Sequence, residues 1–465
     1  MTETLSRMHD ELDMTIRLPM EECGIDTLAG VLLRFCRDHA AMLRSIHDNP
    51  SELDHLTKWS LEFSRWFEEE IDSDVLSTDE LITLDRKFHD VVHMLTQAVK
   101  QQARAEVIVA RAVAEGLDGA LGHRFVAPFQ RRIRVKLNTG DPFPVPRRPL
   151  KEIFAQELGT NPDRMGIPID SLPHLRILQS VGHGHEILLS LEHENALATL
   201  SAGTRVAVLI PSDVRDLEWD TSSPGERPVF YNVRPRDSEQ QTKTVLKLLE
   251  DSRGQAEIVI LPELCIDGAG LEAIKRWYAQ SGDPFAMLVC GSIHVIPEDG
   301  AGWRNISTSL LAGGGTIEHV KFNPFSIVSH DETGKGMEYR EGIRITPSKI
   351  TLYLCGTWTF TILICKDFLE PGAMHILEEL RPGLILVPSC SPKTQPFEME
   401  AGHLALRAQA LVVVANLTDP SADQVSAILA KPLKKDPVEA FRRTTKSPPA
   451  MYIFQVGPPA RKGDR

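Results

Sequence analysis

The spacing of apolar residues changes near Thr204, and this change constrains the fold more than any other feature of the chain. Before it, apolar residues recur every three or four positions with charges between them, as from Phe88 to Val99, which predicts amphipathic helices. After it, short β-branched runs such as 205–210 alternate with amphipathic stretches such as 239–250. This alternation predicts an α/β domain of mixed sheets covered by helices.

The same patterns divide the chain into three predicted regions. Residues 1–140 are expected to form a helical N-terminal domain. Residues 141–203 begin with a proline-rich stretch that cannot be helix or central strand, so we interpret them as a linker and helical connector, with helices at about 150–158 and 175–200. Residues 204–465 form the α/β domain, whose C-terminal boundary the pattern leaves uncertain.

Two local sequence signals predict particular structures. Ser77, followed by acidic residues up to Glu80, predicts the N-terminus of a helix. The glycines within 312–315 predict a tight hairpin that joins strands at 305–311 and 316–322. Further strands are expected at 257–261, 286–295, 350–354, 359–365, 384–387 and 411–416, with 426–430 and 451–455 as candidates near the end. Further helices are expected at 271–279, 374–380 and 399–410.

Composition excludes several classes of protein. The chain has 465 residues, of which 42% are hydrophobic and 25% charged, as in globular proteins. A net charge of −13 argues against general affinity for nucleic acid or for anionic membranes. Residues 1–11 are polar and acidic, unlike a secretory leader, and no apolar run approaches the roughly 20 residues of a membrane span. We therefore expect a cytoplasmic protein.

The seven cysteines are scattered and include no CxxC pair. This pattern disfavours a disulfide scaffold and a structural zinc site. We expect reduced, mostly buried thiols and no metal or organic cofactor.

One of these thiols, Cys365, is a candidate nucleophile. It follows the apolar run 360–364 and precedes a turn that leads into a helix. A cysteine in such a turn lies beside free backbone N–H groups, which favour a thiolate and can bind an oxyanion. By itself this placement is more typical of a buried structural thiol.

Two charged residues also follow predicted strands. Glu263 stands after 258–261 in a turn made by Pro262, and Lys321 follows 316–320. Separately, each is more typical of a solvated surface charge. Because strand ends on one edge of a sheet converge on one crevice, the two can meet Cys365 there.

Taken together, Glu263, Lys321 and Cys365 resemble the glutamate, lysine and cysteine of the nitrilase superfamily of carbon–nitrogen hydrolases, in the same chain order. The surrounding segments resemble those of this family, with 365–371 similar to its amidase-like branches, and the match covers a little under half of the chain. In order along the chain, these segments are 205–210, 256–263, 288–292, 304–311, 316–321, 365–371, 403–410 and 412–416.

The resemblance implies a four-layer α/β/β/α sandwich and a defined chemistry. Glu263 would be the general base and Cys365 the nucleophile that forms a thioester. Lys321 and the backbone N–H of Lys366 would hold the oxyanion. The resemblance also implies association through outer helices into a homo-oligomer.

The chain departs from the family at the second glutamate that many members carry, where it has Lys335. Glu332 fits if the loop carries a short insertion, Glu338 is the rival, and Glu341 is a weaker third. We favour Glu332 as the fourth catalytic group.

Other positions are predicted to shape the oxyanion and substrate site. These are Lys366 and Asp367 after the nucleophile, Asn305 at the start of a hairpin strand, and Ser389, where many relatives have tryptophan. Asp367, in place of a Trp-Glu pair after the cysteine, favours amides or carbamoyl groups over nitriles.

A histidine-rich stretch gives a weaker signal. His183, His185 and Glu186, with His193 and Glu194 further on, suggest a metal at first sight. Alternate residues do not share a helix face, so we interpret these side chains as surface or interface histidines.

We therefore predict a hydrolase of a linear amide or an N-carbamoyl compound. One alternative is a glutaminase-type module that supplies ammonia. The other is a regulatory or effector protein whose helical half binds a protein partner and whose hydrolase half is gated or degenerate.

Overall fold

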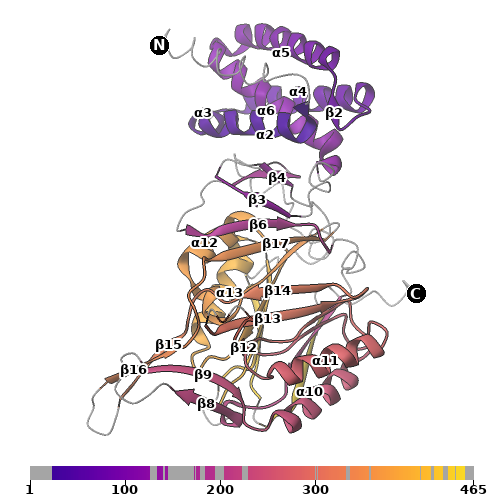
Figure 1. Cartoon of the computed structure of the whole chain (residues 1–465). Helices are drawn as coiled ribbons and strands as arrows, with labels where there is room; N and C mark the ends of the chain where they lie inside the picture. Colours follow the sequence, from indigo (N-terminus) through magenta and orange to yellow (C-terminus); the bar gives the residue numbers. More distant parts are fainter. Residues whose placement is uncertain are drawn as a thin grey trace. The chain divides into compact units, whose positions relative to one another are not determined.

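The computed structural model describes residues 23–125, 134–139, 142–144, 172, 174–178, 184–193, 204–221, 229–298, 300, 302–330, 336–355, 358–408, 410–419, 424–432, 438–445 and 447–455. The chain forms two compact units, 1–147 with 160–180 and 148–159 with 181–465 (Figure 1). No helix among the described residues is long and apolar enough to cross a membrane.

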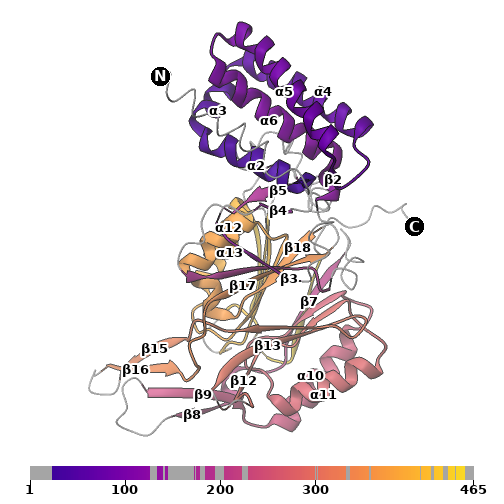
Figure 2. The ribbon, with the colours of Figure 1, turned by 45° about the horizontal axis from the view of Figure 1, so that its top comes forward.

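The first unit contains the helices α2 (Ile25–Asp38), α3 (Ala40–His47), α4 (Pro50–Glu70), α5 (Thr78–Val99) and α6 (Gln102–Leu121). α6 buries residues on every side and lies within the bundle (Figure 2). Gly116 allows α6 to approach α4 closely, since a Cβ there would lie 2.7 Å from Cβ of Phe63. A helix that is buried on every side needs such enclosure by its neighbours.

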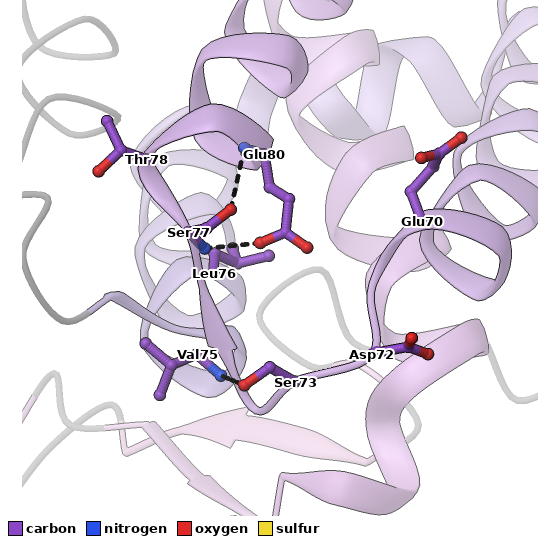
Figure 3. Close-up of a pocket in the computed structure, with 8 residues that line it drawn as sticks. All are labelled: Glu70, Asp72, Ser73, Val75, Leu76, Ser77, Thr78 and Glu80. Atoms are coloured by element: carbon purple, nitrogen blue, oxygen red, sulfur yellow. Dashed lines mark hydrogen bonds between the residues drawn. The ribbon is translucent and has the colours of Figure 1, made fainter.

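α5 begins as its sequence predicts. Ser77 Oγ accepts a hydrogen bond from the Glu80 backbone N–H, and Glu80 Oε2 accepts one from the Ser77 N–H at 2.6 Å (Figure 3). This capping box satisfies N–H groups that have no partner within the helix. The two residues also line a shallow surface hollow with Glu70 and Asp72 at the end of α4.

The first sheet of the second unit has the order β12-β13-β11-β10-β7-β23, with β14 beside β13. Its strands are β7 (Arg205–Ile210), β10 (Ile258–Ile260), β11 (Met287–Val289), β12 (Ile293–Val295), β13 (Arg304–Leu311), β14 (Thr316–Val320) and β23 (Ala450–Gln455). The predicted hairpin is confirmed, because β13 and β14 pair antiparallel and Gly313 and Gly314 adopt positive φ.

The second sheet includes β22-β21-β20-β19-β18-β17-β6 in that order. Its strands are β6 (Glu186–Ser190), β17 (Lys349–Cys355), β18 (Trp358–Ile362), β19 (Leu384–Ser389), β20 (Leu411–Asn416), β21 (Ala427–Pro432) and β22 (Val438–Arg443). The helices α12 (Pro371–Leu380) and α13 (Gln395–Arg407) accompany this sheet, and α13 packs on β20 and β21.

The side chains of β7 point alternately into two hydrophobic cores, so this strand connects the layers of the unit. Val206, Val208 and Ile210 share one core with apolar residues of the second sheet. Ala207 and Leu209 point the other way, into a core with α10 (Ser238–Ser252) and α11 (Gly268–Gln280). A strand with both faces buried reads as a continuous apolar run, as this one does in the sequence. The second unit is therefore a mixed α/β domain, as predicted.

Two parts of the chain differ from the expected pattern. The helix expected at 175–200 is wrong, because β5 (Leu175–Ile177) and β6 are strands; the helix expected at 150–158 lies outside the described residues. β6 pairs parallel with β17. A strand from the supposed connector is thus part of the sheet.

A third sheet, of order β15-β16-β9-β8, was not predicted. It consists of β8 (Leu217–Thr221), β9 (Val229–Pro235), β15 (Ser326–His330) and β16 (Gly336–Glu341). β16 pairs parallel with β9, which fixes the position of Glu341 at the end of β16.

Candidate active site

Cys365 stands at the start of the 3-10 helix η4 (Cys365–Leu369), shortly after β18 ends. Its φ of 48° is left-handed, a conformation that a non-glycine residue holds only when its surroundings enforce it. Lys366 is the next residue of η4, and N–H groups at a helix start lack acceptors within the helix. The turn therefore places the Cys365 sulfur beside the backbone N–H of Lys366 at the start of η4.

Glu263 follows β10, in a turn fixed from both sides. Leu264 N–H donates to Ser292 O at 2.9 Å, and Gly291 has a φ of 68°. A Cβ at Gly291 would collide with the Pro262 carbonyl oxygen, so glycine permits this close approach. The predicted strand over 286–295 is consequently divided here into β11 and β12.

Lys321 follows β14 and joins Glu263 in a buried cluster. Its Nζ lies 2.7 Å from Glu263 Oε1. The other oxygen, Oε2, accepts a hydrogen bond from the Cys390 N–H at 2.9 Å. Glu263, Lys321 and Cys365 are each about 1% exposed. Glu263 and Lys321 both interact with the Cys365 thiol, so the structure brings the three predicted residues together.

A second carboxylate, Glu341, completes the cluster. Lys321 Nζ lies 2.7 Å from its Oε2, and Asn305 Nδ2 donates both to Glu341 Oε1, at 2.8 Å, and to Glu263 Oε1, at 2.9 Å. Glu332, the residue favoured from sequence, lies outside the described residues, and Glu338 is exposed. Among the described residues, Glu341, which the sequence ranked last, is the candidate that contacts Lys321, so we favour it as the second glutamate. The choice of Glu332 stays a prediction.

His294 holds Glu341 and was not singled out in the sequence. The Val233 backbone N–H donates to its Nδ1 at 2.9 Å, and its Nε2 lies 2.9 Å from Glu341 Oε1. A backbone N–H can only donate, so we assign the proton to Nε2, which donates to the carboxylate. The side chain is 1% exposed. The only sequence signal for His294 was its place in the predicted strand 286–295, shortly after Gly291.

Burial and charge together shift the pKa values in this cluster. Burial raises the pKa of the Cys365 thiol to about 12, with Glu263 adding to the rise and Lys321 opposing it. Burial likewise raises the pKa of Glu263 against the effect of Lys321. Burial opposes a charge on Lys321, but Glu263 and Glu341 outweigh it and hold the pKa well above its usual value. Despite burial, Lys321 and His294 hold the pKa of Glu341 far below its usual range.

These shifts indicate how the resting site is charged. An ammonium and a carboxylate persist at Lys321 and Glu341, while Cys365 keeps its proton at neutral pH. A thiol with this pKa needs a neighbouring base to become a nucleophile, and Glu263 is a carboxylate placed beside it. Burial and Glu263 thus oppose the thiolate that the backbone N–H groups of the turn are expected to favour.

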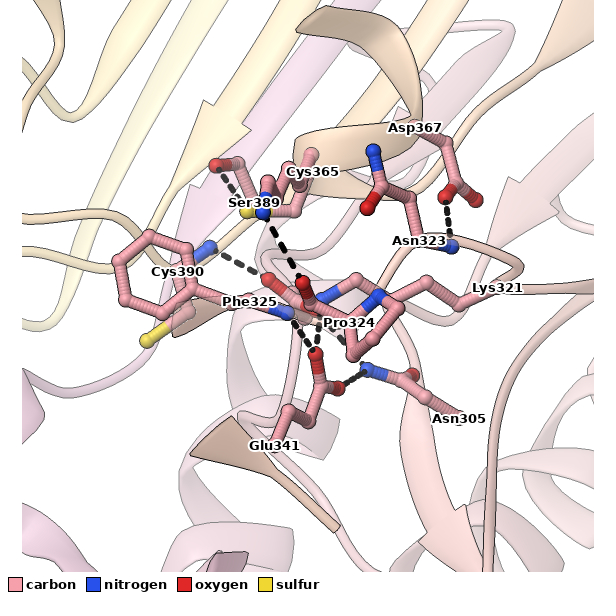
Figure 4. Close-up of polar contacts among 12 residues, drawn as sticks. Asn305, Lys321, Asn323, Pro324, Phe325, Glu341, Cys365, Asp367, Ser389 and Cys390 are labelled. Atoms are coloured by element: carbon pink, nitrogen blue, oxygen red, sulfur yellow. Dashed lines mark hydrogen bonds and ion pairs between the residues drawn. The ribbon is translucent and has the colours of Figure 1, made fainter. Parts of the chain in front are cut away.

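The other predicted site residues lie around the nucleophile. Ser389 Oγ donates to Cys365 Sγ at 3.4 Å, and Lys366 Nζ donates to Pro324 O at 3.2 Å. Asp367 is fully buried and accepts a hydrogen bond from the Asn323 N–H at 2.8 Å (Figure 4). Asp367 thus binds the main chain beyond Lys321. Within the described ranges, no group of three or more His, Cys, Asp or Glu side chains is placed to hold a metal ion.

The preference for Glu341 makes a stability prediction. Its two oxygens accept from four donors: Lys321 Nζ and Phe325 N on Oε2, and His294 Nε2 and Asn305 Nδ2 on Oε1. Glu341→Gln turns one oxygen into an N–H₂ group that faces donors and leaves the buried lysine with one carboxylate. We expect urea denaturation to show a loss of about 3–5 kcal/mol.

The matched control is Glu338→Gln, on the same strand but exposed. Its free energy of unfolding should change by less than about 0.5 kcal/mol, as for ordinary surface substitutions. Equal stability of the two variants would contradict the preference for Glu341.

No family model and no curated protein sequence matches the chain. Solved structures do match. An amidase from Nesterenkonia sp. is 13% identical with a TM-score of 0.39, and the match covers 55% of this chain and 90% of that one. Nit3 from Saccharomyces cerevisiae is 14% identical with a TM-score of 0.38, over 55% and 90%. Both of these solved proteins are members of the nitrilase superfamily, the family whose motifs the sequence resembles.

Proposed function

We propose that this protein hydrolyses a non-peptide carbon–nitrogen bond through a cysteine thioester. The observation that carries the proposal is the buried convergence of Glu263, Lys321 and Cys365 from three separate strand ends. A buried carboxylate and ammonium are unfavourable unless each is paired, so their placement beside a strained cysteine favours a catalytic role over a purely structural one.

The first half of the reaction forms the thioester. Glu263 takes the proton of Cys365 as Sγ attacks the carbonyl carbon of the substrate. Negative charge develops on the substrate oxygen, and Lys321 Nζ and the Lys366 N–H stabilise it. When the C–N bond breaks, Glu263 returns the proton to the nitrogen, so ammonia or an amine leaves and the acyl group remains on sulfur.

The second half releases the acid. Glu263, again ionised, takes a proton from water, whose oxygen attacks the thioester carbonyl. The oxyanion returns to the same donors, the C–S bond breaks, and Cys365 recovers its proton. Glu341 keeps Lys321 in place by accepting a hydrogen bond from its Nζ. Asn305 keeps Glu263 in place, because its Nδ2 donates to Glu263 as well as to Glu341.

We further propose a linear amide or N-carbamoyl compound as substrate, and a four-layer α/β/β/α sandwich for the hydrolase unit. The two cores on opposite faces of β7 support this order of layers. Asp367, rather than an acid–aromatic pair after the nucleophile, supports amides over nitriles.

The direct test is ammonia release from short aliphatic amides, aromatic amides, glutamine and N-carbamoyl amino acids. With water enriched in oxygen-18, we expect one labelled oxygen in the carboxylate product, because water cleaves the thioester. Release from glutamine alone would favour the glutaminase alternative. No release from any compound by folded protein would contradict the proposal and favour a regulatory protein.

A further inference from the structure

Two buried histidines flank Phe322, the residue that follows Lys321. The rings of His185 and Phe322 lie 5.8 Å apart, and those of His319 and Phe322 lie 6.2 Å apart, both edge-on at 78°. His319 belongs to β14, whereas His185 directly precedes β6. Phe322 is 6% exposed. Aromatic contacts in this geometry add to simple burial and restrict the ring between them.

Each histidine also binds a carboxylate on the nucleophile turn. His319 Nε2 lies 3.2 Å from Asp367 Oδ2, and His185 Nε2 lies 3.0 Å from Glu370 Oε2. Both acids lie within five residues of Cys365. Because ionised carboxylates only accept, we assign each Nε2 as a donor. The two imidazoles therefore connect the turn of the nucleophile to the residue beside the catalytic lysine.

The acids have further roles that fix these links in place. Asp367 accepts hydrogen bonds from the main-chain N–H groups of Phe322 and Asn323. Glu370 caps α12 by accepting from the Ala373 N–H at 2.6 Å. A shift of either carboxylate would thus displace the lysine segment or the helix that follows the nucleophile.

His185 itself is fixed by the unexpected strand β6. The Glu186 N–H donates to Ser348 O at 2.7 Å, and β6 then runs in parallel register with β17. The Ser348 hydroxyl also contacts His185 Nδ1. The imidazole is 5% exposed, which corrects our interpretation of it as a surface or interface histidine.

On the basis of the proposed function, we propose that His185 and His319 are positioning residues of the hydrolase site, acting through Phe322, Asp367 and Glu370. The segment that begins at His185 is then part of the catalytic unit, although it precedes the first strand of the motif-bearing region. Such a role matters because displacement of a reacting group by about 1 Å can reduce a rate 100-fold.

The test measures alkylation of Cys365 by iodoacetamide in the full chain, with adducts located by mass spectrometry. For His185→Ala we expect a rate at least about tenfold below wild type, because the thiol and its base lose their alignment. In His185→Gln the amide reaches the position of Nε2 and can donate to Glu370, so the rate should recover. His185→Asn is too short for that contact and should stay slow.

The matched control is His403→Ala. His403 Nε2 lies 2.6 Å from Glu378 Oε1, the same kind of pair, but the histidine side chain is 45% exposed. In this variant Cys365 should be alkylated at the wild-type rate. If His185→Ala does not fold, His185→Gln and His185→Asn still test the positioning role of His185, since both keep a polar side chain.

The outcomes separate this inference from the proposed function. Suppose that Cys365 is alkylated selectively in wild type and at the same rate in His185→Gln and His185→Asn. That result would overturn the positioning role, even if the melting temperatures of the variants fall. Absence of selective labelling in wild type would contradict the proposed function itself.

Discussion

Cys365→Ala is expected to abolish hydrolysis, with a loss of kcat of about 10⁴-fold or more, as for the loss of a nucleophile in other covalent enzymes. The reason is that the Lys321 ammonium has no free electron pair, and the paired Glu263 carboxylate is a far weaker nucleophile than a thiolate. Steady-state ammonia release on the best substrate of the panel measures the effect.

The same variant should remain folded. Alanine tolerates the left-handed φ of 48° no worse than cysteine does, and the hydrogen bond lost from Ser389 is a weak one to sulfur. We expect its melting temperature to stay within a few degrees of wild type. Substantial turnover in this folded variant would show that another group is the nucleophile.

Lys321→Met is expected to have the second largest effect, on both activity and stability. Loss of one oxyanion donor costs about 2.7–4 kcal/mol in the transition state, a fall of 10²–10³-fold in kcat. Removal of the ammonium also leaves Glu263 and Glu341 buried and unpaired, which should reduce the free energy of unfolding by about 3–5 kcal/mol. Kinetics and urea denaturation measure the two effects separately.

The stability deficit of Lys321→Met should depend on pH in a defined direction. In wild type the pKa of Glu341 is held far below its usual range, so its contribution is present above the unfolded pKa and is lost as pH falls through the folded value. The methionine variant lacks the charge that lowers this pKa, and its carboxylates can take up protons more easily. The difference in free energy of unfolding between wild type and Lys321→Met should therefore become smaller from pH 8 to pH 5. A deficit that widens over this range would contradict the ion-pair account.

The double variant Lys321→Met, Glu341→Gln provides the internal control. If the two side chains form one ion pair, their separate losses of stability should not add, and the double variant should be more stable than their sum predicts. Additive losses would indicate that the residues act independently.

The site could be predicted where its residues follow buried strands. Glu263 and Cys365 each come after a continuous apolar run, and Lys321 comes after the alternating segment 316–320. Strand ends on one edge of a sheet converge on one crevice, which allows the three residues to meet. The hairpin at Gly313 and Gly314 was likewise predictable, because glycine is suited to the positive φ of a tight turn.

Glu341 was ranked too low because the position of a second carboxylate depends on a loop of unknown length. The sequence gives spacing along the chain, but Glu341 reaches Lys321 through the pairing of β16 with β9, and β9 itself was not predicted. His294 was missed for a related reason. A lone histidine in a strand has no periodic signal, and its role follows from contacts with Val233 and Glu341.

β6 was predicted as helix because a short apolar segment is ambiguous. Residues 187–189 are Ile-Leu-Leu, which suits a buried strand as well as a helix. Pairing with β17 makes this segment a strand, and this contact joins residues more than 150 positions apart, which a local sequence pattern cannot predict. His185 was consequently interpreted without its true surroundings.

The most direct test of the central claim is the rate of Cys365 alkylation by iodoacetamide at pH 6 and pH 8, followed by intact mass in wild type and Cys365→Ala. An ordinary thiol of pKa about 8.5 reacts roughly 80-fold faster at pH 8, because its thiolate fraction rises. With Glu263 as base, we expect one dominant adduct at Cys365, absent from the variant, whose rate changes by less than about tenfold. Labelling of Cys365 no faster than the other cysteines, or with the steep pH dependence of a free thiol, would contradict the account.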